Sequence, residues 1–168
     1  MTTPAPAPPT DRRGLARVVR VALILVGVGP FVPPLVTGVP GLEPAGRLLE
    51  AWFGFQCHRD PARSLALLGH ALPVCARCLG IYSGLGLGGL VAWPRLGAAA
   101  LRIWVLAAAL VMVLDVLAEG LALHPEWRAV RIITGVMLAY PVGTALVHAA
   151  RYGSRSVPGV RATDPRPR

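Results

Sequence analysis

The 168-residue sequence contains no lysine, and charged residues of all kinds make up only 15% of it. A soluble domain of this length would carry more charge and a lower apolar fraction. The sequence also lacks a nucleotide-binding glycine loop, a Ser-His-Asp pattern and an H-E-x-x-H motif. These absences argue against a soluble domain and leave the substrate class unspecified.

Apolar residues are abundant: they make up 54% of the chain, and the mean hydropathy is +0.58. They fall in four blocks, each long enough to cross about 30 Å of hydrocarbon, which takes roughly 20 residues per helix. The blocks are 18–39, 73–93, 103–123 and 129–149. We therefore predict an all-α integral membrane bundle of about four transmembrane helices in the cell membrane.

The segments around these blocks complete the predicted organisation. Residues 1–17 and 152–168 are rich in proline and arginine and are expected to be disordered tails of a membrane domain at 18–151. Apolar residues in the 40–72 loop predict a short amphipathic helix at the membrane surface. The first apolar block follows a basic stretch, a pattern also typical of a signal peptide, so the sequence leaves its retention open.

The net charge of +9 reflects 17 arginines against eight acidic residues. Eleven arginines lie before or at the start of the first block, between the second and third, or after the fourth, and six lie on the other side. The positive-inside rule then predicts that both termini are cytoplasmic. The basic excess indicates topology and contact with an anionic lipid bilayer rather than with nucleic acid. Homo-oligomerisation and protein partners stay open.

All three cysteines lie close together in the sequence and near histidines. Cys57 is followed by His58, and Cys75-Ala-Arg-Cys78 forms a C-x-x-C at the predicted start of the second helix, five residues after His70. A tetrahedral zinc site takes cysteine and histidine in proportions such as Cys₃His. We therefore predict a metal site of Cys57, His58, Cys75 and Cys78, with His70 in reserve, zinc as the favoured ion and iron as an alternative. Water in the fourth position would make the site catalytic.

Thiol–disulfide exchange is a second interpretation of the same cysteines. A helix N-terminus and the neighbouring Arg77 both stabilise a thiolate, so Cys75 would attack and Cys78 would resolve. Cys57 would relay electrons, and the protein would pass them between outer thiols and a lipid-soluble quinone. A third interpretation is a structural membrane subunit whose zinc only holds the 40–72 loop onto the second helix. The remaining alternative, without any such function, is a plain Cys75–Cys78 or Cys57–Cys75 disulfide or inert buried cysteines.

Ionisable residues inside the apolar blocks need partners. Asp115 lies in the third block with Glu119 one turn later, and Arg131 lies in the first turn of the fourth. Such residues cost roughly 2.5–3.5 kcal/mol each at a helix centre. An Asp115–Arg131 or Glu119–Arg131 ion pair is therefore expected. On the functional interpretation, Asp115 and Arg131 support a metal ligand or handle protons.

Small residues recur at every fourth position in the second and fourth blocks. They are Gly80, Gly84 and Gly88, and Gly135, Ala139 and Gly143. Such stripes let helix backbones approach closely in lipid, so they predict a tightly packed bundle.

Two stretches carry a resemblance to a known family. Cys-His-Arg-Asp-Pro-Ala-Arg-Ser occupies 57–64, and Gly-His-Ala-Leu-Pro-Val-Cys-Ala-Arg-Cys-Leu-Gly-Ile-Tyr-Ser-Gly occupies 69–84. With Asp115 and Arg131, these stretches make residues 50–145 resemble the prokaryotic membrane family known as domain of unknown function 2085. The resemblance implies a multi-pass membrane protein and brings no assigned activity.

Overall fold

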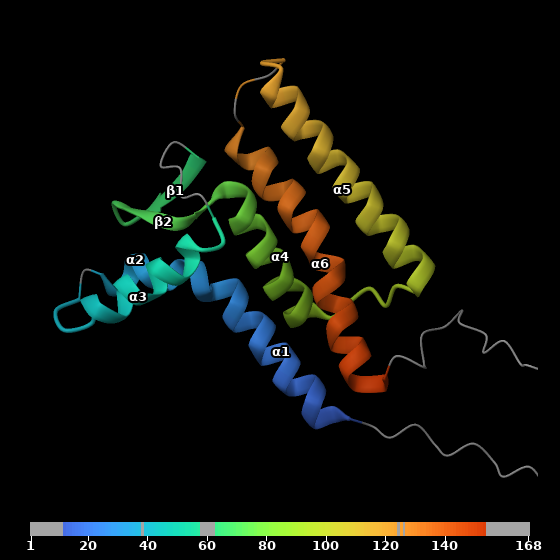
Figure 1. Ribbon diagram of the computed structural model, residues 1–168. Helices are drawn as coiled ribbons and strands as arrows, with labels where there is room; N and C mark the ends of the chain where they lie inside the picture. Colours follow the sequence, from blue (N-terminus) through green and yellow to red (C-terminus); the bar gives the residue numbers. More distant parts are fainter. Residues whose placement is uncertain (1–11, 38, 58–62, 124, 126, 154–168) are drawn as a thin grey trace, which may run out of the picture.

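The computed structural model describes residues 12–37, 39–57, 63–123, 125 and 127–153 (Figure 1). Within them the chain is mainly helical, with one two-stranded sheet. The elements are α1 (Arg13–Val28), η1 (Gly29–Phe31), α2 (Val32–Val36), α3 (Glu43–Gly54), β1 (Ser64–Leu67), β2 (His70–Cys75), α4 (Ala76–Val91), α5 (Ala98–Gly120) and α6 (Arg128–Tyr152). Most of the two predicted tails lies outside the described residues.

The all-α membrane fold is confirmed. Three helical segments are long and apolar enough to cross a membrane, namely Arg13–Val36, α5 and α6, and α4 is a shorter apolar helix of 16 residues. The first segment begins at Arg13, five residues before the predicted block and inside the predicted N-terminal tail. The second helix begins three residues later than predicted, because residues 73–75 continue strand β2.

Helix α4 lies between α1 and α6, and α5 packs on the far side of α6 at the edge of the bundle (Figure 1). The contact between α4 and α6 is a backbone contact. A Cβ atom added at Gly80 would lie 2.2 Å from the carbonyl oxygen of Ile132, and one at Gly88 would lie 2.2 Å from that of Tyr140. The glycine stripes thus form the tight helix contact that their spacing predicts.

The two ends of the bundle differ in what they carry. The Arg12 N–H donates to the Arg151 carbonyl oxygen at 3.3 Å, so α1 begins beside the end of α6. The opposite end carries α3, the sheet and the start of α4 (Figure 1). We call the first the terminal end and the second the cap end.

Helix α3 is the short helix predicted in the 40–72 loop. Leu48, Trp52 and Phe55 are spaced four and three residues apart, and all three are exposed, Phe55 to 91%. Phe53 is buried against the cap end instead. An apolar face without protein cover suits a helix that lies in the membrane interface.

The β1–β2 hairpin was not expected from the sequence. Its strands pair antiparallel with Leu67 opposite His70, so Leu68 and Gly69 form a two-residue turn. Both turn residues have positive φ, +52° and +81°, as a type I′ turn requires. Strand β2 then runs directly into α4, which fixes the C-x-x-C segment relative to the hairpin.

Candidate metal centre

A small apolar core holds the cap end together. Phe53, Cys57, Leu72, Val74 and Leu79 are buried in it, and Val74 is fully inaccessible to solvent. These residues come from the end of α3 and the stretch after it, from β2 and from the first turn of α4. The core therefore brings the Cys57 stretch onto the C-x-x-C segment.

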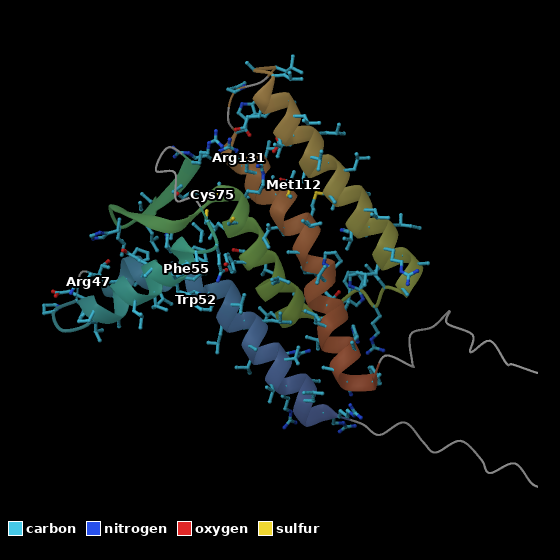
Figure 2. The ribbon with its side chains drawn as sticks, viewed as in Figure 1. Arg47, Trp52, Phe55, Cys75, Met112 and Arg131 are labelled. Atoms are coloured by element: carbon cyan, nitrogen blue, oxygen red, sulfur yellow. The ribbon has the colours of Figure 1, made fainter. Side chains whose placement is uncertain are left out.

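Cys75 marks the junction between strand and helix. Its backbone is extended, with φ −71° and ψ 163°, and it is the N-cap of α4 (Figure 2). Cys78 follows three residues later, in the first turn of the helix. A strand that turns into a helix at the first cysteine leaves both thiols of the C-x-x-C on the same side.

The three cysteines converge on one point. Their sulfur atoms all lie within 4.8 Å of one another, and none of the three is in a disulfide. Zn–S bonds of about 2.3 Å in a tetrahedron put sulfur atoms about 3.8 Å apart, so only a small adjustment separates this cluster from a zinc site. The Cys75 N–H donates to the Cys57 sulfur at 3.2 Å, which ties the Cys57 stretch to the strand–helix junction.

Burial and hydrogen bonding differ among the thiols. Cys57 is 8% exposed, while Cys75 and Cys78 are half-buried. The hydrogen bond from the Cys78 side chain lowers the pKa of Cys75 from 9.0 to about 5, against the opposing effect of burial. Cys75 therefore ionises more readily than an ordinary thiol, which suits either metal binding or thiol exchange.

Of the two histidines predicted as ligands, only His70 lies in the described part of the chain. His58 lies outside the described residues. His70 is exposed at the first residue of β2, five residues from Cys75, and roughly 16 Å of extended strand separates them. The three cysteines thus come together without His70.

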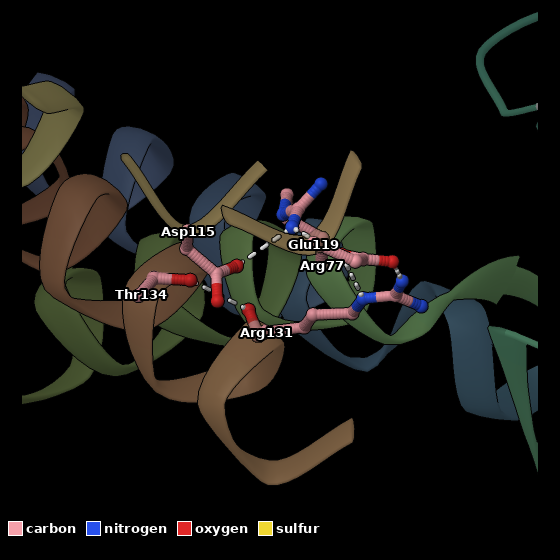
Figure 3. Close-up of polar contacts among 5 residues, drawn as sticks. All are labelled: Arg77, Asp115, Glu119, Arg131 and Thr134. Atoms are coloured by element: carbon pink, nitrogen blue, oxygen red, sulfur yellow. Dashed lines mark hydrogen bonds and ion pairs between the residues drawn. The ribbon is translucent and has the colours of Figure 1, made fainter. Parts of the chain in front are cut away.

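The buried ionisable residues form a network that joins three helices (Figure 3). Arg77 of α4 contacts Asp115 of α5 at 2.7 Å and Glu119 at 3.6 Å. Arg131 of α6 pairs with Glu119, and its Nε donates to Glu119 at 3.2 Å. Of the two predicted ion pairs, the Glu119–Arg131 pair is therefore present.

Arg77 was not predicted to be a partner of Asp115. The sequence signalled only that a second cation was needed, because the expected ion pairs assigned both carboxylates, Asp115 and Glu119, to Arg131. The second cation comes from between the two cysteines of the C-x-x-C, so Arg77 joins this network to the segment that carries two of the thiols. Sequence reasoning also missed Tyr82, whose hydroxyl donates to Gln56 next to Cys57 and whose ring meets Phe53 edge-on.

A pocket of about 570 Å³ opens beside this network. Arg63, Arg77, Glu119 and the end of α5 line it, and none of the three cysteines does. Any molecule in this pocket would meet two guanidinium groups and one carboxylate before it met a sulfur atom. Arg77 is the residue that the pocket and the C-x-x-C segment share.

We expect Asp115→Asn to destabilise the fold by about 2 kcal/mol, because it leaves the Arg77 charge without its closest partner. This is less than for a fully enclosed pair, since the Arg77 side chain is 21% exposed. Thermal unfolding in detergent measures the loss. An Arg77→Gln/Asp115→Asn double variant should lose less than the sum of the single variants. If the stability losses of the two single variants simply added in the double variant, the Arg77–Asp115 ion pair would be contradicted.

Apolar spanning helices and a cap with a three-cysteine cluster define the chain as an integral membrane protein. It matches the family described as "Predicted membrane protein (DUF2085)" over residues 57–145, more than half of its length. The chain belongs to this family. The matched region contains all three cysteines and both acid–arginine pairs.

Two curated archaeal proteins are similar to the chain. The uncharacterized protein MJ1492 of Methanocaldococcus jannaschii is 34% identical over 99 residues, 56% of this chain and 63% of that protein. An uncharacterized protein of Methanothermobacter thermautotrophicus is 53% identical over 32 residues, 19% of this chain and 29% of that protein. The chain thus covers less than two thirds of either relative. No solved structure matches it.

Proposed function

We propose that the protein is a multi-pass membrane protein that binds one zinc ion at its cap end through Cys57, Cys75 and Cys78. The observation that carries the proposal is the convergence of three sulfur atoms within 4.8 Å from two separate stretches of chain. Thiolates in this number and spacing are the preferred ligands of zinc, with iron as the alternative ion. The ion would tie the end of α3 to the strand–helix junction.

His58 is our proposed fourth ligand, because it follows Cys57 directly in the sequence. With His58 bound the site is closed and structural, whereas water in its place would make a catalytic site with a water pKa of about 7. His58→Ala should weaken zinc binding and His70→Ala should not. If His70→Ala weakened zinc binding and His58→Ala did not, the fourth ligand would be His70.

Elemental analysis of the protein, purified in mild detergent without chelator, tests the proposal. We expect about one zinc per chain, and thiols that resist alkylation until a chelator removes the ion. Protein without metal whose thiols alkylate at once would contradict it. A metal-bound protein whose cysteine variants only lose abundance would fit a structural subunit.

Thiol–disulfide exchange is the second candidate, favoured by the position of Cys75 at the N-cap of α4 with Cys78 beside it. A Cys75–Cys78 disulfide would accept two electrons from two substrate thiols, which leave as a disulfide. A quinone would then take the two electrons and two protons and restore the Cys75–Cys78 bond. Alkylation before and after reduction distinguishes this function, because it requires a reducible bond and no metal.

The arginine distribution supports an orientation with both termini in the cytoplasm and the cap end outside. This orientation would place the cysteines on the oxidising side of a cell membrane, where a bound ion protects thiols from disulfide formation. A reporter enzyme fused to the C-terminus tests it, since alkaline phosphatase activity there would contradict a cytoplasmic end.

A further inference from the structure

The terminal end of the bundle contains a basic pocket of about 600 Å³, far from the cysteines. Its polar lining consists largely of arginine. The basic side chains in the lining are Arg13, Arg17, Arg20, Arg95, Arg151 and His148. Among the lining residues, all of which lie in the described part of the chain, there is no carboxylate.

Three separate segments build this pocket. Arg13, Arg17 and Arg20 are four and three residues apart on α1, so they share one face of the helix. Arg95 comes from the connection between α4 and α5, and Arg151 from the last turn of α6. Because the segments are remote in sequence, the convergence of charge is a property of the fold.

Local contacts hold the walls of the basic pocket in place. His148 Nε2 donates to the Ala92 carbonyl oxygen at 3.0 Å, which ties α6 to the α4–α5 connection. The Arg151 guanidinium lies 5.2 Å from the centre of the Tyr152 ring, and its backbone oxygen accepts from Arg12. The pocket therefore has a defined shape before any ligand arrives.

The positive charge of the lining favours an anionic ligand. Five guanidinium groups around one cavity repel one another, and an anion among them relieves that repulsion. Guanidinium groups match phosphate oxygens in geometry and hydrogen-bonding capacity, often in bidentate pairs. The chemistry of the lining thus favours an oxyanion such as a phosphate group.

The depth of the pocket indicates the source of the phosphate. The spanning segment of α1 begins at Arg13 and α6 ends at Tyr152, so the pocket lies where lipid headgroups meet the helix ends. Ala16 and Val147 are buried in its wall, and the Trp93 side chain beside them is largely exposed. We infer that the basic pocket binds the phosphate headgroup of an anionic phospholipid.

Native mass spectrometry of the full-length protein in mild detergent tests this inference, with phosphatidylglycerol and phosphatidylcholine as the lipids. We expect phosphatidylglycerol to bind at least about tenfold more tightly, and Arg17→Gln/Arg20→Gln to lose roughly tenfold or more of that affinity. Equal binding of the two lipids would overturn the inference. Millimolar inorganic phosphate added alone distinguishes the sources: saturation of the pocket by phosphate itself would assign the site to free phosphate.

Matched variants distinguish lipid binding in the basic pocket from a general effect of the positive charge of the protein. Arg47→Gln/Arg102→Gln removes the same charge outside the pocket lining and should leave lipid affinity unchanged. Arg17→Lys/Arg20→Lys keeps the charge but loses the forked hydrogen-bond geometry, so it should lose part of the affinity, and less than Arg17→Gln/Arg20→Gln does. If the control pair lost as much affinity as Arg17→Gln/Arg20→Gln, the arginines would act through overall charge, and the proposed pocket would be wrong. Thermal unfolding without added lipid checks that all variants fold.

Discussion

We expect that replacing any one of the three cysteines by serine lowers the proposed zinc affinity by at least about a hundredfold, so that a mild chelator removes the metal. Serine keeps the size of the side chain but stays protonated near neutral pH, so it supplies no thiolate. Because Cys57 and the C-x-x-C approach from different elements, two remaining sulfurs cannot complete the site. Zinc content measured after dialysis against chelator gives the result.

Val74→Ala is the matched control for the cysteine variants. Val74 neighbours Cys75 in the same core and is fully buried, but it offers no ligand atom. Its truncation opens a cavity and lowers stability, while about one zinc per chain should remain. If Val74→Ala lost zinc as completely as Cys57→Ser, the metal loss would reflect disruption of the core rather than removal of a ligand.

The same cysteine variants discriminate between the two candidate functions. Zinc binding requires all three sulfurs, whereas thiol exchange requires Cys75 and Cys78, with Cys57 only as a relay. Under thiol exchange, Cys57→Ser would retain a reducible Cys75–Cys78 bond. Under zinc binding, Cys57→Ser would damage the site as much as Cys78→Ser.

The helical spans could be predicted because they depend on local composition. A block of some 20 apolar residues indicates a spanning helix whatever its neighbours are. The start of α1 was placed too late for the same reason. Arg13 and Arg17 interrupt an apolar window, but a helix continues through arginines whose charged ends reach the headgroup region.

The hairpin could not be predicted, because its signals are weak. β1 is only four residues long, and the turn is Leu68-Gly69 rather than Asn-Gly or Asp-Gly. Its pairing depends on the core beneath it, where Leu72 and Val74 pack against Phe53 of α3. A short strand stabilised by tertiary packing leaves little trace in the local sequence.

The cysteine cluster could be predicted in part. Three cysteines with the ligand chemistry of zinc implied that they meet, and their sulfurs do lie together. The partner of Asp115 could not be identified in the same way. Arg77 reaches α5 from the first turn of α4, and only the relative position of the two helices decides that contact.

Gly80→Ala and Gly88→Ala should lower the midpoint of thermal unfolding in detergent by roughly 5 °C or more, and the double variant by more than either. The added methyl group at either site would lie 2.2 Å from a carbonyl oxygen of α6. A carbonyl oxygen of a helix cannot move aside as a flexible side chain can, so α4 and α6 must separate. Their separation weakens the contact on which α4, at the centre of the bundle, depends.

Gly14→Ala is the matched control, because a Cβ atom there has no neighbour within 4 Å and the residue lies in the first turn of α1. The substitution should leave the unfolding midpoint unchanged or raise it slightly, since alanine favours a helix more than glycine does. If Gly14→Ala and Gly88→Ala had the same midpoint of thermal unfolding, α4 and α6 would not be in backbone-to-backbone contact. A lower unfolding midpoint for Gly88→Ala but not for Gly14→Ala attributes the stability of the bundle to close helix packing. Such packing is the main source of helix association in lipid.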